Sequence, residues 1–169
     1  MRSKFISRVL FVLGIVLVLL AFGYWYKLTY SMEVAENSGI NSPQLATKIL
    51  IATQGSDFKD AIVTNLINFY KKDSVHLKTI DVTQLRQVKP NEYNAIILLH
   101  TWEYGKPPRI VSQFINENSA LKNKMIVYAT SGAGNNKIEG IDAMAGESIL
   151  ENASDVSDEV IEKIESILK

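Results

Sequence analysis

The chain of 169 residues contains no cysteine, and its only histidines are His76 and His100. The lack of cysteine excludes disulfide bonds, thiolate metal sites, cysteine nucleophiles and a lipid anchor attached to cysteine. Two histidines also exclude a histidine-rich metal site. The sequence offers no set of a nucleophile, a base and an orienting group. It therefore favours an electron carrier or a binding module over an enzyme with its own acid and base.

The chain also lacks an excess of positive charge over most of its length. Its formal net charge is zero, with 18 basic and 18 acidic residues. Residues 28–169 carry 14 of the basic side chains and all 18 acidic ones, which gives this part a net charge of −4. A mildly acidic domain has no electrostatic footprint for nucleic acid, so we expect no nucleic-acid partner.

Charged residues are absent from Val9–Trp25, which is a continuous apolar run. Seventeen helical residues span about 25 Å, and flanking aromatic residues extend the reach toward the ~30 Å of a hydrocarbon core. We therefore expect a transmembrane anchor over residues 9–26, preceded by a basic tail over residues 1–8. The membrane is thus the first predicted partner of this chain.

Basic residues set the expected orientation of this anchor. Arg2, Lys4 and Arg8 precede the apolar run, whereas only Lys27 follows it closely. The positive-inside bias then places the N-terminus in the cytoplasm and the domain outside it, as in a single-pass protein of the cell membrane. The alternative is a signal peptide, because residues 21–23 offer small side chains at a spacing suited to cleavage. The domain would then be exported after cleavage.

Residues 27–46 are polar and contain turn-forming residues, so we expect a linker there. Residues 47–169 then alternate short apolar runs with segments of helical spacing. The predicted strands are 48–53, 75–82, 95–99 and 125–130, with a doubtful fifth over 141–149, and the predicted helices are 58–70, 108–117 and 157–169. This alternation predicts an α/β domain in which helices cover both faces of a parallel sheet.

Two features of this pattern stand apart. The run 75–82 alternates apolar and polar residues, which is typical of an edge strand. Only ten residues, 131–140, separate the fourth run from the fifth, and they lack helical spacing, although a parallel crossover normally needs a dozen or more residues.

Ser157 is the expected N-terminal cap of the last predicted helix, 157–169.

Three loops follow the three central strands, and ligands bind at the carboxyl ends of strands in open α/β sheets. The first loop precedes a helix N-terminus, which offers N–H groups to a phosphate. The second carries aromatic residues that can stack on a planar ring, and the third has small residues that let the backbone approach a ring edge. The candidate binding residues are Thr53, Gln54, Gly55, Ser56, Asp57 and Phe58 in the first loop, Thr101, Trp102, Tyr104 and Gly105 in the second, and Ser131, Gly132, Ala133 and Gly134 in the third.

Each loop also has a plainer interpretation. The first is compatible with a simple capped helix start, and the third with a simple tight loop. The aromatic residues of the second are compatible with packing over the edge of the core, and His100 with a core histidine. These alternatives stay open at the level of the sequence.

The Thr101-Trp102 pair resembles the isoalloxazine-binding loop of flavodoxins, where a Thr-Trp pair ends the third strand. Residues 53–56 are compatible with the flavodoxin phosphate loop, and residues 131–135 resemble the loop after the fourth strand. Asp57 and Phe58 depart from the pattern, because a carboxylate repels a phosphate and a hydroxyl is expected at position 58.

This resemblance covers about residues 47–169 and implies a small doubly wound flavodoxin-like sheet with strand order 2-1-3-4(-5). It also implies a membrane-tethered domain that binds FMN non-covalently and transfers electrons to a redox partner protein, with the flavin supplying the chemistry. The rival interpretation is a flavin-free interaction or scaffold module that kept the fold and lost the cofactor, since fold does not fix function.

A third interpretation is covalent attachment of FMN to Ser148. Asp142, Gly146 and Ser148 resemble a degraded form of the Asp-x-x-Ser/Thr-Gly-Ala-Ser/Thr segment that carries FMN in some extracytoplasmic electron-transfer proteins. Ala145 and Glu147 do not match that pattern.

Overall fold

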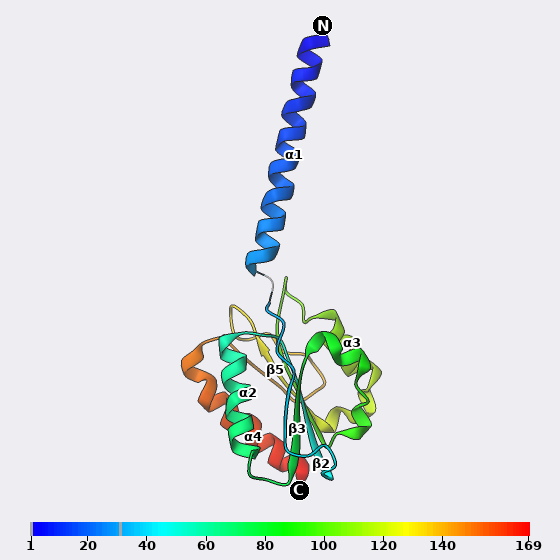
Figure 1. The fold of residues 1–169 in the computed structure, drawn as a ribbon, viewed down its shortest axis with the longest axis vertical. Coiled ribbons are helices and arrows are strands. Elements are labelled where there is room, and N and C mark those ends of the chain that lie inside the picture. The colour runs from blue at the N-terminus through cyan, green and yellow to red at the C-terminus, as the bar shows by residue number, and fades with distance from the viewer. Residues whose placement is uncertain (1, 31) are drawn as a thin grey trace. The chain divides into compact units, whose positions relative to one another are not determined.

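The computed structural model describes residues 2–30 and 32–169, which belong to two units (Figure 1). The described part of the first unit, Met1–Met32, is dominated by the helix α1 (Arg2–Tyr30). Within it, Lys4–Tyr26 has a mean hydropathy of 2.7 and is long and apolar enough to cross a membrane. None of this stretch is buried, as expected for an anchor or a signal sequence.

A six-stranded sheet forms the centre of the second unit, Glu33–Lys169. Its strands are β1 (Ser38–Ile40), β2 (Thr47–Thr53), β3 (Val75–Asp81), β4 (Ala95–Thr101), β5 (Met125–Thr130) and β6 (Ala143–Gly146). They lie in the order β1-β3-β2-β4-β5-β6, and all neighbours are parallel except β1 and β3. Leaving β1 aside, this is the order 2-1-3-4-5, so the predicted parallel sheet is confirmed.

Helices cover both faces of this sheet (Figure 1). Helices α2 (Asp57–Tyr70) and α4 (Ala153–Leu168) pack together on one face, and α3 (Arg109–Glu117) lies on the other. Short 3₁₀ helices complete the connections, namely η1 (Val82–Gln87), η2 (Pro90–Glu92), η3 (Ser119–Lys124) and η4 (Leu150–Asn152). Helices α2 and α3 thus agree with the predicted segments to within one residue, whereas α4 begins four residues earlier than predicted.

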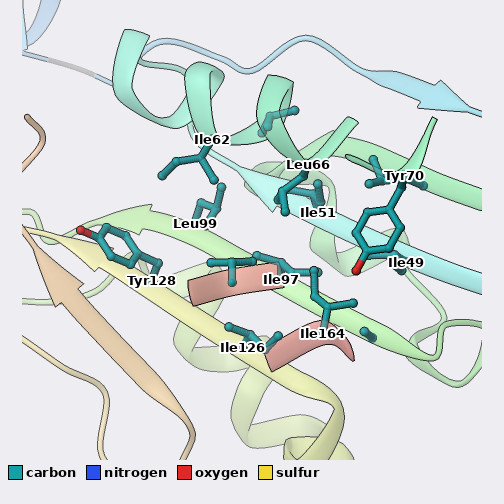
Figure 2. Packing of buried hydrophobic residues seen from close by; sticks show 14 of the residues in the cluster. Ile49, Ile51, Ile62, Leu66, Tyr70, Ile97, Leu99, Ile126, Tyr128 and Ile164 are labelled. Atoms are coloured by element: carbon teal, nitrogen blue, oxygen red, sulfur yellow. The ribbon is translucent and has the colours of Figure 1, made fainter. Parts of the chain in front are cut away.

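The apolar runs form strands because alternate side chains fill a core on each face. On the α2 side, Ile62 and Leu66 of the helix point onto Ile51 and Leu99 of the sheet (Figure 2). The opposite core contains Leu50, Ala52, Ile96, Leu98 and Val127 of the strands with Val111, Phe114 and Ile115 of α3. This alternation directs the odd-numbered side chains of β4 toward α2 and the even-numbered ones toward α3.

Strand β1 lies within the segment for which the sequence predicts a linker. It pairs antiparallel with β3, so that Ser38 faces Thr79 and Ile40 faces Leu77. The prediction that 75–82 is an edge strand is consequently wrong, because β1 occupies the edge. Asn41 directly follows β1, and its side-chain amide donates to the carbonyl oxygen of Val75, the first residue of β3, at 2.7 Å.

The doubtful fifth strand exists as β6, parallel to β5. The intervening residues 131–142 contain no helix. Ile138 and Ile141 of this connection pack against the α3-side core and cover it in place of a crossover helix. A bare loop therefore completes the parallel crossover.

The predicted cap of the last helix is wrong. Helix α4 begins at Ala153, so Ser157 lies inside it. The Ser157 hydroxyl donates to the Ala153 carbonyl oxygen at 2.6 Å and accepts from the Asn65 amide nitrogen at 3.1 Å. A serine that hydrogen-bonds the preceding turn is tolerated in a helix, and here it also joins α4 to α2.

Candidate functional site

The first predicted loop follows β2 and is crossed by the segment that precedes β1. The Gly55 N–H donates to the carbonyl oxygen of Glu33 at 2.8 Å. We call residues 33–37 the strap. The Asp81 carboxylate holds it by accepting from the Ala35 N–H at 2.9 Å, and the Asp81 N–H donates to the Asn37 side chain at 3.3 Å. The strap therefore uses a backbone donor on which the predicted phosphate loop depends.

Ser56 and Asp57 begin helix α2 at the end of this loop. The Ser56 hydroxyl caps the helix by accepting from the Lys59 N–H at 3.3 Å. Asp57 is exposed in the first turn, whereas Phe58 is buried in the core with its ring 5.8 Å from that of Tyr128. The structure thus places Phe58 away from any ligand at this edge of the sheet.

Lys59 is a buried lysine at the carboxyl ends of the central strands. Lys59 is 1 % exposed, and its ammonium group donates to Thr101 Oγ1 at 2.8 Å and Ser56 Oγ at 3.2 Å. Burial lowers the pKa of Lys59 to about 8, while the carboxylates of Asp60 and Glu103 oppose this shift. Hydroxyl oxygens and nearby carboxylates are what a buried ammonium requires.

The second loop is joined to the first by the side chain of Gln54. Gln54 Oε1 accepts from the Thr101 N–H at 2.7 Å, and Gln54 Nε2 donates to Glu103 at 3.3 Å. Thr101 Oγ1 also lies 2.8 Å from Thr130 Oγ1, which extends the network to the end of β5. Thr53 joins locally, since its hydroxyl donates to the Gln54 carbonyl oxygen at 3.0 Å.

The two aromatic residues of the second loop lie in different environments. Residues 103–106 form a tight hairpin, and its central residues Tyr104 and Gly105 have φ of 52° and 72°, as in a type I′ turn. Tyr104 is 86 % exposed at this tip. Trp102 is half-buried, and its N–H at Nε1 is buried without a hydrogen-bond partner in the described part of the chain.

The third loop leaves β5 beside the end of β6. The Ser131 N–H donates to the Gly146 carbonyl oxygen at 3.1 Å, and the Gly134 N–H closes a turn onto Ser131 at 3.1 Å. Gly132 and Ala133 at the turn are exposed. Ser131 Oγ is buried and has no partner among the described residues. This loop therefore offers one unused hydroxyl beside the network.

The chain matches no protein-family model, and no curated protein sequence matches it. Among solved structures it is similar to a flavodoxin from the domain Archaea, with a TM-score of 0.50 and 14 % sequence identity. The match covers 73 % of this chain and the whole of that one. The second unit has a flavodoxin-like fold. At this identity the likeness concerns the fold alone.

The first loop of this flavodoxin-like domain does not fit the phosphate of FMN. The Glu33 carbonyl oxygen already accepts the Gly55 N–H, and a Cβ built on Gly55 would lie 2.9 Å from that oxygen. Asp57, Asp60 and Glu33 add negative charge around the start of α2. The ammonium group of Lys59 is directed to Thr101 and Ser56. A phosphate would have to displace the strap and meet three carboxylates.

The structure brings together some of the predicted site residues and separates others. Gln54, Ser56 and Thr101 meet in one network, and Ser131 lies at the next strand end. Tyr104 and Phe58 lie apart from it, one in solvent and one in the core. The network also includes residues that the sequence analysis did not select, namely Lys59, Glu103 and Thr130. Glu33 of the strap, which contacts Gly55, was not selected either.

Lys59 carried a signal that the sequence analysis overlooked. It lies three and four residues before Ile62 and Val63, which is the spacing of one helix face. Because that face covers the sheet, the position predicts a side chain directed toward the strand ends. Glu33 carried no such signal, since its role comes from a backbone carbonyl.

Ser148 lies just beyond β6 and is exposed. Asp142 of the same segment forms an ion pair with Lys163 of α4 at 2.9 Å. The segment therefore combines a reachable hydroxyl with a structural carboxylate, and Ser148 remains a predicted attachment site.

Proposed function

We propose that this chain is a flavodoxin-fold interaction module, attached to the membrane by α1, that binds protein partners in place of FMN. The supporting observation is the hydrogen bond from the Gly55 N–H to the Glu33 carbonyl oxygen. The chain's own strap thereby supplies the acceptor that a phosphate would supply in the first loop. The absence of an acid–base or nucleophile set supports a binding role over a catalytic one.

A titration with FMN tests this function directly. We expect the full-length chain, purified in detergent micelles, to be colourless and to leave the fluorescence of added FMN unchanged. A flavodoxin that holds FMN, stripped of its cofactor and assayed in the same detergent, serves as the positive control. Saturable quenching of FMN fluorescence at one equivalent would overturn the proposal.

The second candidate is an FMN-dependent electron carrier with a redox partner protein. It is supported by two buried polar groups at the second and third loops, Trp102 Nε1 and Ser131 Oγ, which lack partners in the described residues. A polar ring edge would satisfy such groups. If FMN binds, Trp102→Ala should weaken binding at least tenfold, whereas Tyr104→Ala, at the exposed tip, should change it less than twofold. An unchanged affinity for Trp102→Ala would contradict a contact between Trp102 and the ring.

Covalent attachment at Ser148 predicts a different result. Yellow colour that survives denaturation and precipitation would support it, and Ser148→Ala should then abolish the colour. A chain that is colourless after expression with flavin available would contradict this reading.

A further inference from the structure

A groove of about 450 Å³ lies between the strap and helix α2. Strands β2 and β3 form its floor, and the strap and α2 form its walls. Its lining includes Glu33, Glu36, Asp60, Val63, Ile67 and Thr79. No residue of the second or third loop lines the groove.

The floor of the groove contains a buried hydroxyl that is not used. Thr79 is 2 % exposed, and its Oγ1 has no hydrogen-bond partner in the described part of the chain. The alternation along β3 directs Thr79 to the same face as Leu77, which packs under α2. A buried hydroxyl without a partner destabilises a fold, so a ligand that bonds it gains from an existing deficit.

The walls and the rim of the groove differ in chemistry. Ala35, Val63 and Ile67 present apolar surface. Glu33, Glu36 and Asp60 are exposed carboxylates, and no lysine or arginine lines the groove. Burial raises the pKa of Asp60, with repulsion from Asp57 and Glu33 adding to the shift and Lys59 opposing it. The rim is therefore a concentration of negative charge that a cation would relieve.

The chemistry of the lining favours an organic cation as the occupant. An anion such as phosphate would be repelled by the three carboxylates. No group of three or more His, Cys, Asp or Glu side chains within the described ranges could hold a metal ion. An aliphatic stem that ends in an ammonium or guanidinium group matches both the apolar walls and the acidic rim.

We propose that this groove receives a lysine or arginine side chain of a partner protein, with the stem against Val63 and Ile67. The charged head then lies between the Asp60 carboxylate and the Thr79 hydroxyl and donates an N–H to each. This deepens the proposed function, on which it rests, by identifying the partner as a basic segment. The net charge of −4 over residues 28–169 assists the approach of such a segment.

A peptide titration tests the groove. The probe is acetyl-Lys-Lys-Lys-amide, added to the ¹⁵N-labelled full-length chain in detergent micelles, with amide chemical shifts as the readout. We expect saturable shifts at Ala35, Val63 and Thr79. Acetyl-Glu-Glu-Glu-amide should cause none, and butylammonium should bind at least tenfold more weakly than the lysine peptide.

Three variants make the test specific. Thr79→Val keeps the shape of the side chain and removes the hydroxyl, so it should weaken peptide binding at least threefold without lowering the melting temperature. Asp60→Asn should also weaken binding at least threefold. Asp57→Asn is the matched control, because it removes the same charge from the same helix turn outside the groove, and it should change binding less than 1.5-fold.

Several outcomes would overturn the proposal. These are the absence of saturable shifts, equal losses in Asp57→Asn and Asp60→Asn, and full affinity in Thr79→Val. Butylammonium binding as tightly as the peptide would overturn the protein partner and assign the groove to a free amine. The FMN titration reports separately on the first loop, so its failure is distinguishable from failure of the peptide titration.

Discussion

Two basic side chains are buried at the end of β4, and they meet different surroundings. The ammonium group of Lys59 on the α2 side has hydroxyl partners. His100 on the α3 side is 0 % exposed, and neither ring nitrogen has a partner among the described residues. Burial lowers the pKa of His100 to about 4, and the Lys59 charge adds to this effect. His100 is therefore a neutral core residue, in agreement with its interpretation as a core histidine.

A neutral buried histidine makes stability depend on pH. The ordinary pKa of histidine is 6.5, so the unfolded chain takes up the proton first as the pH falls. The contribution of neutral His100 to the free energy of unfolding should be fully present above pH 6.5. It should fall by on the order of 3 kcal/mol as the pH drops to about 4. In His100→Leu this part of the loss should disappear. Thermal unfolding of both proteins in micelles, from pH 4 to 8, measures it. Parallel profiles would contradict the assignment.

At the scale of elements, the strap is the part of the domain that is hardest to predict. The apolar runs of β2, β4 and β5 predict buried parallel strands, because a strand that is buried on both faces requires a continuous run of apolar residues. β1 has only three residues, and the strap is held by bonds between residues 46 positions apart, such as Ala35 to Asp81. No local periodicity encodes such contacts. The same is true of the predicted phosphate loop, whose sequence is compatible with a site that the strap then covers.

Gly55→Ala tests the contact between the strap and the first loop. The added Cβ would lie 2.9 Å from the Glu33 carbonyl oxygen, so the strap must shift, at a cost of about 1–3 kcal/mol. Gly132→Ala is the matched control, because its Cβ meets nothing within 4 Å, and it should change stability by less than about 0.5 kcal/mol. Denaturant unfolding measures both values. Faster proteolysis within residues 33–37 in Gly55→Ala alone would locate the change, and equal stability of the two variants would contradict the contact.

At the scale of the whole molecule, the two units have opposite surface character. The side chains of Lys4–Tyr26 are apolar and exposed, so water is an unsuitable surrounding for them. The second unit buries its apolar residues in two cores of its own. Both cores of the second unit are formed by residues of that unit, and the exposed apolar surface of α1 suits an anchor or a signal sequence.

A retained anchor and a cleaved signal peptide predict different proteins in the cell. If α1 is retained, the intact mass should be that of all 169 residues, and the chain should stay in the membrane pellet after an alkaline carbonate wash. Cleavage after Gly23 would instead give a chain that starts at Tyr24 and leaves the pellet.

Replacing Leu13 and Leu17 by lysine raises the free energy of membrane insertion by about 2.5–3.5 kcal/mol per charge, so this variant should lose membrane retention. Leu13→Ile with Leu17→Ile is the control that keeps it. A reporter enzyme fused to each end reads the orientation, and activity of a cytoplasmic reporter at the C-terminus would contradict a domain outside the cytoplasm.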